Sequence, residues 1–129
     1  MSIRKMIAAH PDVAGHVNEP LALAVKHAMY AAVITTSCAD ACSAEEMDMR
    51  QCIRLCLDAA DVCTATARVA ARRTGDDDQV LRVVLTACID ACSICAAECE
   101  KHDHEHCRRC AEMCRECADD CREALATVK

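Results

Sequence analysis

The spacing of the cysteines constrains the fold of this chain more than any other feature of its sequence. Residues 107–121 read CRRCAEMCRECADDC, so that successive cysteines are three or four positions apart. Such steps repeat one face of an α-helix, which completes a turn about every 3.6 residues. At about 100° per residue, Cys88, Cys92, Cys95 and Cys99 fall within a wedge of about 60° on a second segment. The cysteines therefore predict long helices that each bury a cysteine-lined face.

Capping and turn residues divide the chain into helical segments. Asn18 with Pro20 marks the start of a helix, and Ser43 with Glu46 has the pattern of a capping box. Gly75 and Asp103 mark the two remaining breaks. We predict a short helix at residues 2–9 and four long helices at residues 19–42, 44–74, 77–101 and 104–127.

Four helices with short connections favour an all-α fold, an antiparallel up-down-up-down four-helix bundle with a short N-terminal helix. No segment shows the alternation of apolar and polar residues that is typical of a strand. We expect a single cysteine-lined domain over residues 1–129. Within it, residues 1–17 form an N-terminal preface and loop, and residues 18–128 form the bundle.

The composition indicates that the cysteines bind metal. The chain of 129 residues has 14 cysteines but no Trp, no Phe and one Tyr. A core selected for stability alone would use Leu and Ile, which bury more apolar area than Cys. No apolar signal-peptide segment follows Arg4 and Lys5, so we expect a cytoplasmic protein whose thiols stay reduced. Reduced thiols at this density are typical of a metal-binding protein.

Several classes of function are disfavoured. A net charge of −6 without a basic patch argues against nucleic acid as a partner. Lys26 and His27 interrupt the most apolar stretch, so we expect no membrane segment. We find no nucleophile paired with a base and no phosphate-binding loop, and we expect no catalysis.

The choice of metal follows from coordination chemistry. Helical steps of three and four place two sulfurs within about 5–7 Å, a span that one Cu(I) ion can bridge. Zinc requires four converging ligands, and the cysteine run typical of ferredoxins is absent. The residues favour Cu(I). An iron–sulfur or thiol/disulfide redox protein and a zinc or heavy-metal buffer remain as alternatives.

The pairs CADAC, CIRLC and CIDAC, together with the run CRRCAEMCRECADDC, resemble the bacterial cytosolic copper storage proteins over residues 19–127. The resemblance implies a homotetramer of four-helix bundles whose cysteines hold many Cu(I) ions. It makes every cysteine a candidate ligand: Cys38, Cys42, Cys52, Cys56, Cys63, Cys88, Cys92, Cys95, Cys99, Cys107, Cys110, Cys114, Cys117 and Cys121. The first long helix has only two of them, both near its carboxyl end, so we expect the protein to bind fewer Cu(I) ions than relatives with more cysteines.

The cysteines crowd toward one end of the expected bundle. We name this end, where the connections near residues 43–49 and 101–106 meet, the mouth. Met49, His104 and His106 lie there as candidate accessory ligands that could receive Cu(I). Leu81, Leu85 and Leu125 are expected to fill the opposite, closed end. His27 lies on the cysteine face of its helix, where a core histidine bonded to a neighbour is favoured over a ligand.

The first long helix is apolar nearly all round. Val25, Met29, Tyr30 and Val33 point away from the face that carries Cys38. A helix that is apolar on every side is buried on every side, so we expect a homo-oligomer with this helix at the main interface. The other candidate partner of the protein is a copper donor, either a copper chaperone or a small thiol.

Overall fold

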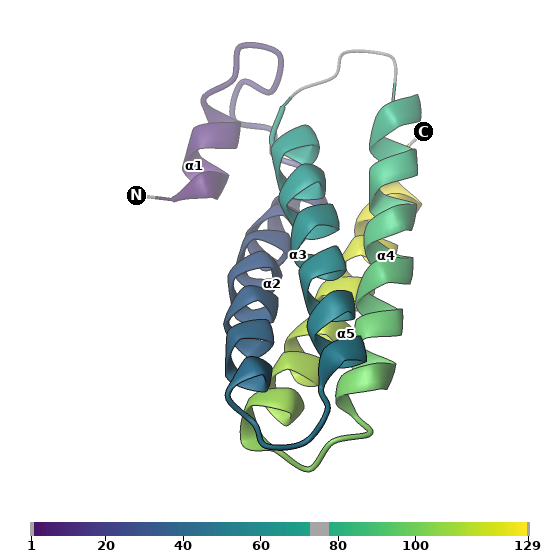
Figure 1. Cartoon of the computed structure of the whole chain (residues 1–129). Coiled ribbons are helices and arrows are strands. Elements are labelled where there is room, and N and C mark those ends of the chain that lie inside the picture. Colours follow the sequence, from purple (N-terminus) through teal and green to yellow (C-terminus); the bar gives the residue numbers. More distant parts are fainter. Residues whose placement is uncertain (1, 73–77, 129) are drawn as a thin grey trace.

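Four long antiparallel helices surround a common core in the computed structural model, which describes residues 2–72 and 78–128 (Figure 1). Helix α2 packs against α3 and α5, and α4 packs against the same two helices, so α2 and α4 lie diagonally opposite. Within the described residues there is no strand, which confirms the predicted all-α bundle. The helices are α1 (Ile3–Ala8), α2 (Glu19–Ser43), α3 (Arg50–Ala70), α4 (Gln79–Cys99) and α5 (Glu105–Thr127).

Helix α2 begins as the sequence predicts, and α1 begins one residue after its predicted start. The side-chain oxygen of Asn18 accepts a hydrogen bond from the backbone N–H of Leu21 at 3.1 Å, and Pro20 lies in the first turn of α2. The hydroxyl of Ser2 accepts from the N–H of Lys5 at 3.3 Å and caps α1. Each cap satisfies one of the N–H groups that a helix start leaves without an intrahelical partner.

The predicted capping box at Ser43 is wrong. Ser43 is the last residue of α2, and its hydroxyl donates to the carbonyl of Asp40 at 2.5 Å. Helix α3 begins only at Arg50, whose N–H donates to the carboxylate of Asp48 at 3.0 Å. Because Asp48 provides this acceptor, residues 44–49 form a connection rather than a first helical turn.

The predicted cap at Asp103 is also wrong, since His104 occupies the cap position of α5 and Asp103 pairs with Arg108 at 2.6 Å. The predicted turn at Gly75 lies outside the described residues. The connections over residues 44–49 and 100–104 lie side by side at one end of the bundle, and α1 lies near the other (Figure 1). The mouth and the closed end are therefore arranged as expected.

Hydrocarbon fills the closed end, with one change from the prediction. Leu81 and Leu85 are buried, whereas Leu125 is only partly buried, because Ala124 and Val128 of the same chain end turn inward instead. The loop over residues 10–16 approaches Leu81 across a small cavity of about 70 Å³.

We expect Leu85→Ala to lower the free energy of unfolding by about 2–5 kcal/mol, because it leaves a cavity among close-packed side chains. Leu85 is 0% exposed, whereas Val83 on the same helix is 67% exposed. Val83→Ala is the matched control, and its effect should stay within about 0.5 kcal/mol. Urea unfolding of the metal-free proteins measures both changes, and equal effects would contradict a packed closed end.

Helices α2 and α4 both have the length and hydropathy of membrane-spanning segments, a test that core helices of soluble bundles also pass. In this structure each buries a cysteine-bearing face in the bundle core. Their outer faces are also apolar: Met29, Tyr30 and Val33 of α2 and Val83 and Ile94 of α4 are exposed. The hydropathy of these two helices thus reflects a buried inner face combined with an apolar outer one.

Candidate metal centre

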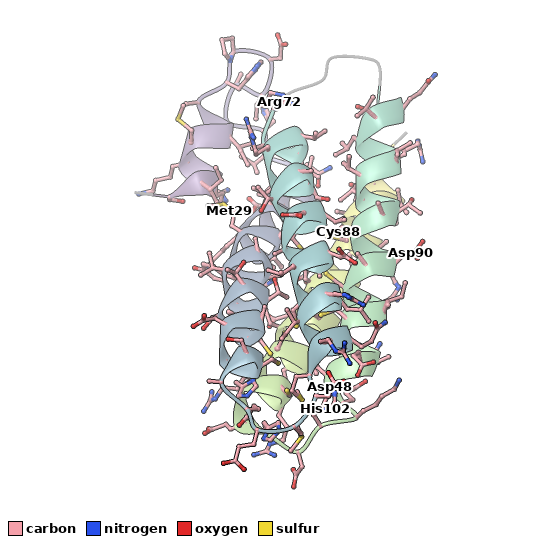
Figure 2. The ribbon with its side chains drawn as sticks, in the orientation of Figure 1. Met29, Asp48, Arg72, Cys88, Asp90 and His102 are labelled. Carbon is pink, nitrogen blue, oxygen red and sulfur yellow. The ribbon has the colours of Figure 1, made fainter. Side chains whose placement is uncertain are left out.

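All fourteen cysteines are free thiols whose residues are at most 2% exposed. Two come from α2, three from α3, four from α4 and five from α5. Figure 2 shows Cys88 directed between the helices, whereas Asp90 on the same helix points outward. The spacing of three and four therefore places every thiol on the axis of the bundle, as the sequence predicts.

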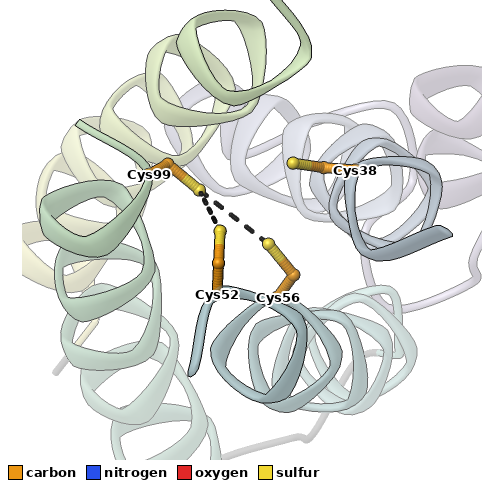
Figure 3. A group of neighbouring side chains, drawn as sticks. All are labelled: Cys38, Cys52, Cys56 and Cys99. Atoms are coloured by element: carbon orange, nitrogen blue, oxygen red, sulfur yellow. Dashed lines mark hydrogen bonds between the residues drawn. The ribbon is translucent and has the colours of Figure 1, made fainter. Parts of the chain in front are cut away.

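Near the mouth, sulfurs from three helices approach one another. The Sγ of Cys42 lies 3.7 Å from that of Cys52, and Cys99 lies 3.8 Å from both Cys52 and Cys56. Figure 3 shows Cys52, Cys56 and Cys99 together with Cys38, which points into the same space from α2. Four sulfurs from α2, α3 and α4 thus lie within reach of a shared ion.

Further from the mouth, α3, α4 and α5 continue the chain of sulfurs. The Sγ of Cys63 lies 3.4 Å from that of Cys92 and 3.8 Å from that of Cys88. Cys88 in turn lies 3.8 Å from Cys117. Cys114 connects the sulfurs near the mouth with those further from it. Its thiol interacts with Cys95 and Cys110 on the mouth side and with Cys92 on the other side.

The sulfurs form groups of four whose ligand atoms all lie within 4.8 Å of one another. Two groups near the mouth share Cys56 and Cys99, so single thiols can serve more than one ion. Sequence reasoning did not find these groups, because it considered only thiols on the same helix. Three such groups are Cys38, Cys52, Cys56 and Cys99; Cys56, Cys95, Cys99 and Cys110; and Cys63, Cys88, Cys92 and Cys117.

Neighbouring thiols shift each other's pKa values. Hydrogen bonds from Cys110 and Cys56, assisted by His106, lower the pKa of Cys38 to about 6. Burial raises the pKa of its neighbour Cys42 to about 11. The surroundings at the mouth therefore favour the thiolate form of Cys38 and the protonated form of Cys42. The thiolate is the form that binds metal and the thiol must first release a proton.

His106 connects this thiolate with the surface. Its Nδ1 lies 3.4 Å from the Sγ of Cys38 and 3.6 Å from that of Cys107, and its Nε2 lies 2.9 Å from a carboxylate oxygen of Glu45. Burial lowers the pKa of His106, but the hydrogen bonds to Cys38 and Glu45 outweigh burial and leave it raised. Nδ1, Cys38, Cys107 and Cys42 form one more group of candidate ligands.

His104 lies beside His106 but makes no contact with a thiol among the described residues. Its Nδ1 is 3.0 Å from the same Glu45 oxygen, and the two imidazole rings stack with centroids 5.4 Å apart. The predicted accessory ligands at the mouth therefore separate into two kinds. His106 contacts the thiol core, whereas His104 contacts His106 and Glu45.

Two methionines border the thiols. Met49 is 3% exposed, so the predicted accessory ligand is a buried side chain at the start of α3. Sequence reasoning missed Met113, which is also buried and lines a surface groove of about 380 Å³ together with Cys38 and His106. Its position three residues after Cys110, at the edge of the cysteine face, was the available signal.

His27 pairs with carboxylates on α5. Its Nδ1 forms a short contact with Asp120 and lies 3.6 Å from Glu116. This arrangement agrees with the favoured interpretation of a histidine bonded to its neighbours rather than to a metal. The ring joins α2 to α5 outside the chain of sulfurs.

Known proteins similar to this chain include copper storage proteins. The chain is 44% identical to a copper storage protein of Streptomyces lividans loaded with 10 copper equivalents, covering 97% of this chain and 98% of that one with a TM-score of 0.91. A structure described as a cytosolic copper storage protein from the same organism, with five coppers, gives 47% identity and a TM-score of 0.83 over 86% of this chain and 96% of that one. Variants of the Streptomyces protein have one histidine, or two histidines four residues apart, changed to alanine. His102 and His106 have the same spacing here.

A curated relative is the uncharacterized cysteine-rich protein YhjQ of Bacillus subtilis, which is 38% identical over 61 residues. That match spans 47% of this chain and 53% of the relative. The copper storage protein family matches residues 17–126, which include all fourteen cysteines. By this match across all four long helices, the chain belongs to the copper storage protein family.

Proposed function

We propose that this protein stores and sequesters Cu(I) in the cytoplasm, with the thiolates of all fourteen cysteines as ligands and without catalysis. The observation that carries the proposal is the series of buried sulfurs along the bundle axis, in which the Sγ atoms of Cys63 and Cys92 lie 3.4 Å apart and those of Cys38 and Cys42 lie 4.0 Å apart. Cu(I) binds two or three thiolates, and a chain of shared sulfurs suits many such ions. Family membership and the copper-loaded Streptomyces structures support the same metal.

A zinc buffer is the second candidate, and one observation favours it. The group of Cys63, Cys88, Cys92 and Cys117 supplies four buried sulfurs, the number that a tetrahedral zinc site requires. Two groups near the mouth, however, share Cys56 and Cys99. One thiolate cannot be the terminal ligand of two separate tetrahedral zinc ions. Shared sulfurs favour an ion of lower coordination number, which is Cu(I).

Anaerobic titration of the reduced protein separates these candidates. Cu(I) is added from a chromophoric chelator, and the bound metal per chain is read from the colour that the chelator loses. Storage requires many ions per chain, whereas closed zinc-like sites would saturate at a few. An iron–sulfur protein would instead be coloured after iron and sulfide reconstitution. We propose a copper chaperone or a small thiol as the physiological donor.

We propose that α2 forms the main interface of a homo-oligomer, a tetramer by family resemblance. Met29, Tyr30 and Val33 are 45%, 49% and 70% exposed on its outer face. Covering such a face removes apolar surface from water, which favours association. We expect light scattering to give a multiple of 14.0 kDa at micromolar concentration. Met29→Glu with Val33→Glu should shift the mass toward the monomer, whereas Asp58→Glu on α3 should not. A monomeric parent would contradict the interface.

A further inference from the structure

The cluster of Glu45, His104 and His106 at the mouth has a different chemistry from the thiol core. Glu45 comes from the connection between α2 and α3, and the two histidines come from the start of α5. Their three ligand atoms lie within 4.8 Å of one another, and both imidazoles direct a nitrogen at the same carboxylate oxygen. Two nitrogens and one oxygen suit a borderline divalent ion such as Zn²⁺ better than Cu(I), which thiolates select.

The geometry needs little change to hold such an ion. The two nitrogens lie 3.0 and 2.9 Å from the Glu45 oxygen. Ligands bound about 2.1 Å from a tetrahedral ion lie about 3.4 Å apart, so these atoms would separate by about half an ångström. All three side chains are partly exposed, at 23–28%, so an ion can reach them from solvent and a water can complete its coordination.

His106 belongs to both the outer cluster and the thiol core. Its Nε2 faces Glu45, whereas its Nδ1 faces Cys38. A neutral imidazole has one N–H, so an ion bound to one nitrogen leaves the proton on the other. An ion at Nε2 therefore leaves Nδ1–H as a donor to the Cys38 sulfur, and Cu(I) at Nδ1 leaves Nε2–H as a donor to Glu45. Binding at both nitrogens would require the ring to lose its last proton.

We propose that Glu45, His104 and His106 form a binding site for a divalent borderline cation of the Zn²⁺ class, and that its occupancy excludes Cu(I) coordination by His106. The site is a gate at which divalent ions slow the loading of copper. The first part stands on the cluster alone, and the second rests on the proposed storage of Cu(I).

Co²⁺ is the probe for the first part, because its spectrum distinguishes nitrogen and oxygen ligands from thiolates. We expect the Co²⁺ spectrum of the reduced parent to contain the visible bands of an N/O site beside any sulfur-to-metal charge transfer from ions bound to thiols. Glu45→Gln should weaken this binding on the order of tenfold or more, as loss of a metal ligand or its support does. His102→Ala is the matched control, since His102 pairs with Glu98 at 2.9 Å and lies outside the cluster. Co²⁺ bound only through sulfur, with Glu45→Gln unchanged, would overturn the site.

The second part is tested by stopped-flow uptake of Cu(I) with and without one equivalent of Zn²⁺. Zn²⁺ should slow uptake on the order of tenfold in the parent and in His102→Ala, and much less in Glu45→Gln. Equal slowing in all three proteins would show that Zn²⁺ acts through the thiols, and would overturn the gate. Final Cu(I) capacity, measured in the same samples, tests storage separately, so failure of the gate and failure of storage are distinguishable.

Discussion

Reduced protein titrated with Cu(I) under anaerobic conditions should saturate near one copper per cysteine, on the order of ten to fourteen ions per chain. If each thiolate bridges two ions and each ion takes two thiolates, ligands and ions are equal in number. The sulfur chain supports such bridging, because Cys99 lies 3.8 Å from both Cys52 and Cys56. Saturation at three or four ions would instead indicate closed tetrahedral sites.

Removing sulfurs should lower this capacity in proportion. Cys63→Ala with Cys92→Ala breaks the closest sulfur pair, 3.4 Å apart, and should cost about two ions per chain. Leu85→Ala is the matched control, because it disturbs packing at the closed end without removing a ligand. The metal-to-protein ratio after gel filtration measures each capacity. An unchanged ratio in the double variant would show that these thiols are only packing residues.

Cu(I) should enter at the mouth, so the triple change of Met49, His104 and His106 to alanine should slow uptake on the order of tenfold. His106 contributes most, because its Nδ1 lies 3.4 Å from the Cys38 sulfur, whose pKa is lowered to about 6. Final capacity should stay nearly unchanged, since all fourteen thiols remain. Stopped-flow uptake from a Cu(I)–chelator complex, without divalent ions, measures the rate.

The same experiment distinguishes the two ends of the bundle. Leu85→Ala changes the closed end, where Leu81 and the loop over residues 10–16 cover the core. It should lower stability without changing the uptake rate. If the triple variant loads as fast as the parent, Met49, His104 and His106 take no part in the uptake of Cu(I).

The helices of this protein could be predicted from local patterns. The cysteine spacing defines one face of each helix, and Asn18 caps α2 through a contact three residues away. The errors also have a local cause, since the side chains of Ser43 and Asp103 find other partners and leave the cap positions to Met49 and His104. Ser43 bonds back to Asp40 and leaves the start of α3 to Asp48, and a scan of the sequence for capping residues cannot rank the two.

The late start of α3 shapes the mouth. Because its first residue is Arg50, residues 44–49 pass over the mouth and bring Glu45 to the histidines of α5. The sequence indicated neither this contact nor the burial of Met49 at 3% exposure. The partial burial of Leu125 has a similar origin, because the direction of the last turn of α5 depends on its packing.

Spacing along the chain was enough to place fourteen thiols on the axis of a four-helix bundle, because the faces of a helix depend on nothing else. Which thiols meet depends on tertiary packing. Cys63 meets Cys92, and His106 lies between Cys38 and Glu45. These contacts join residues 29 to 68 positions apart. They depend on how far each helix is rotated and shifted along its neighbours, which the packing of whole side chains determines and no local pattern records.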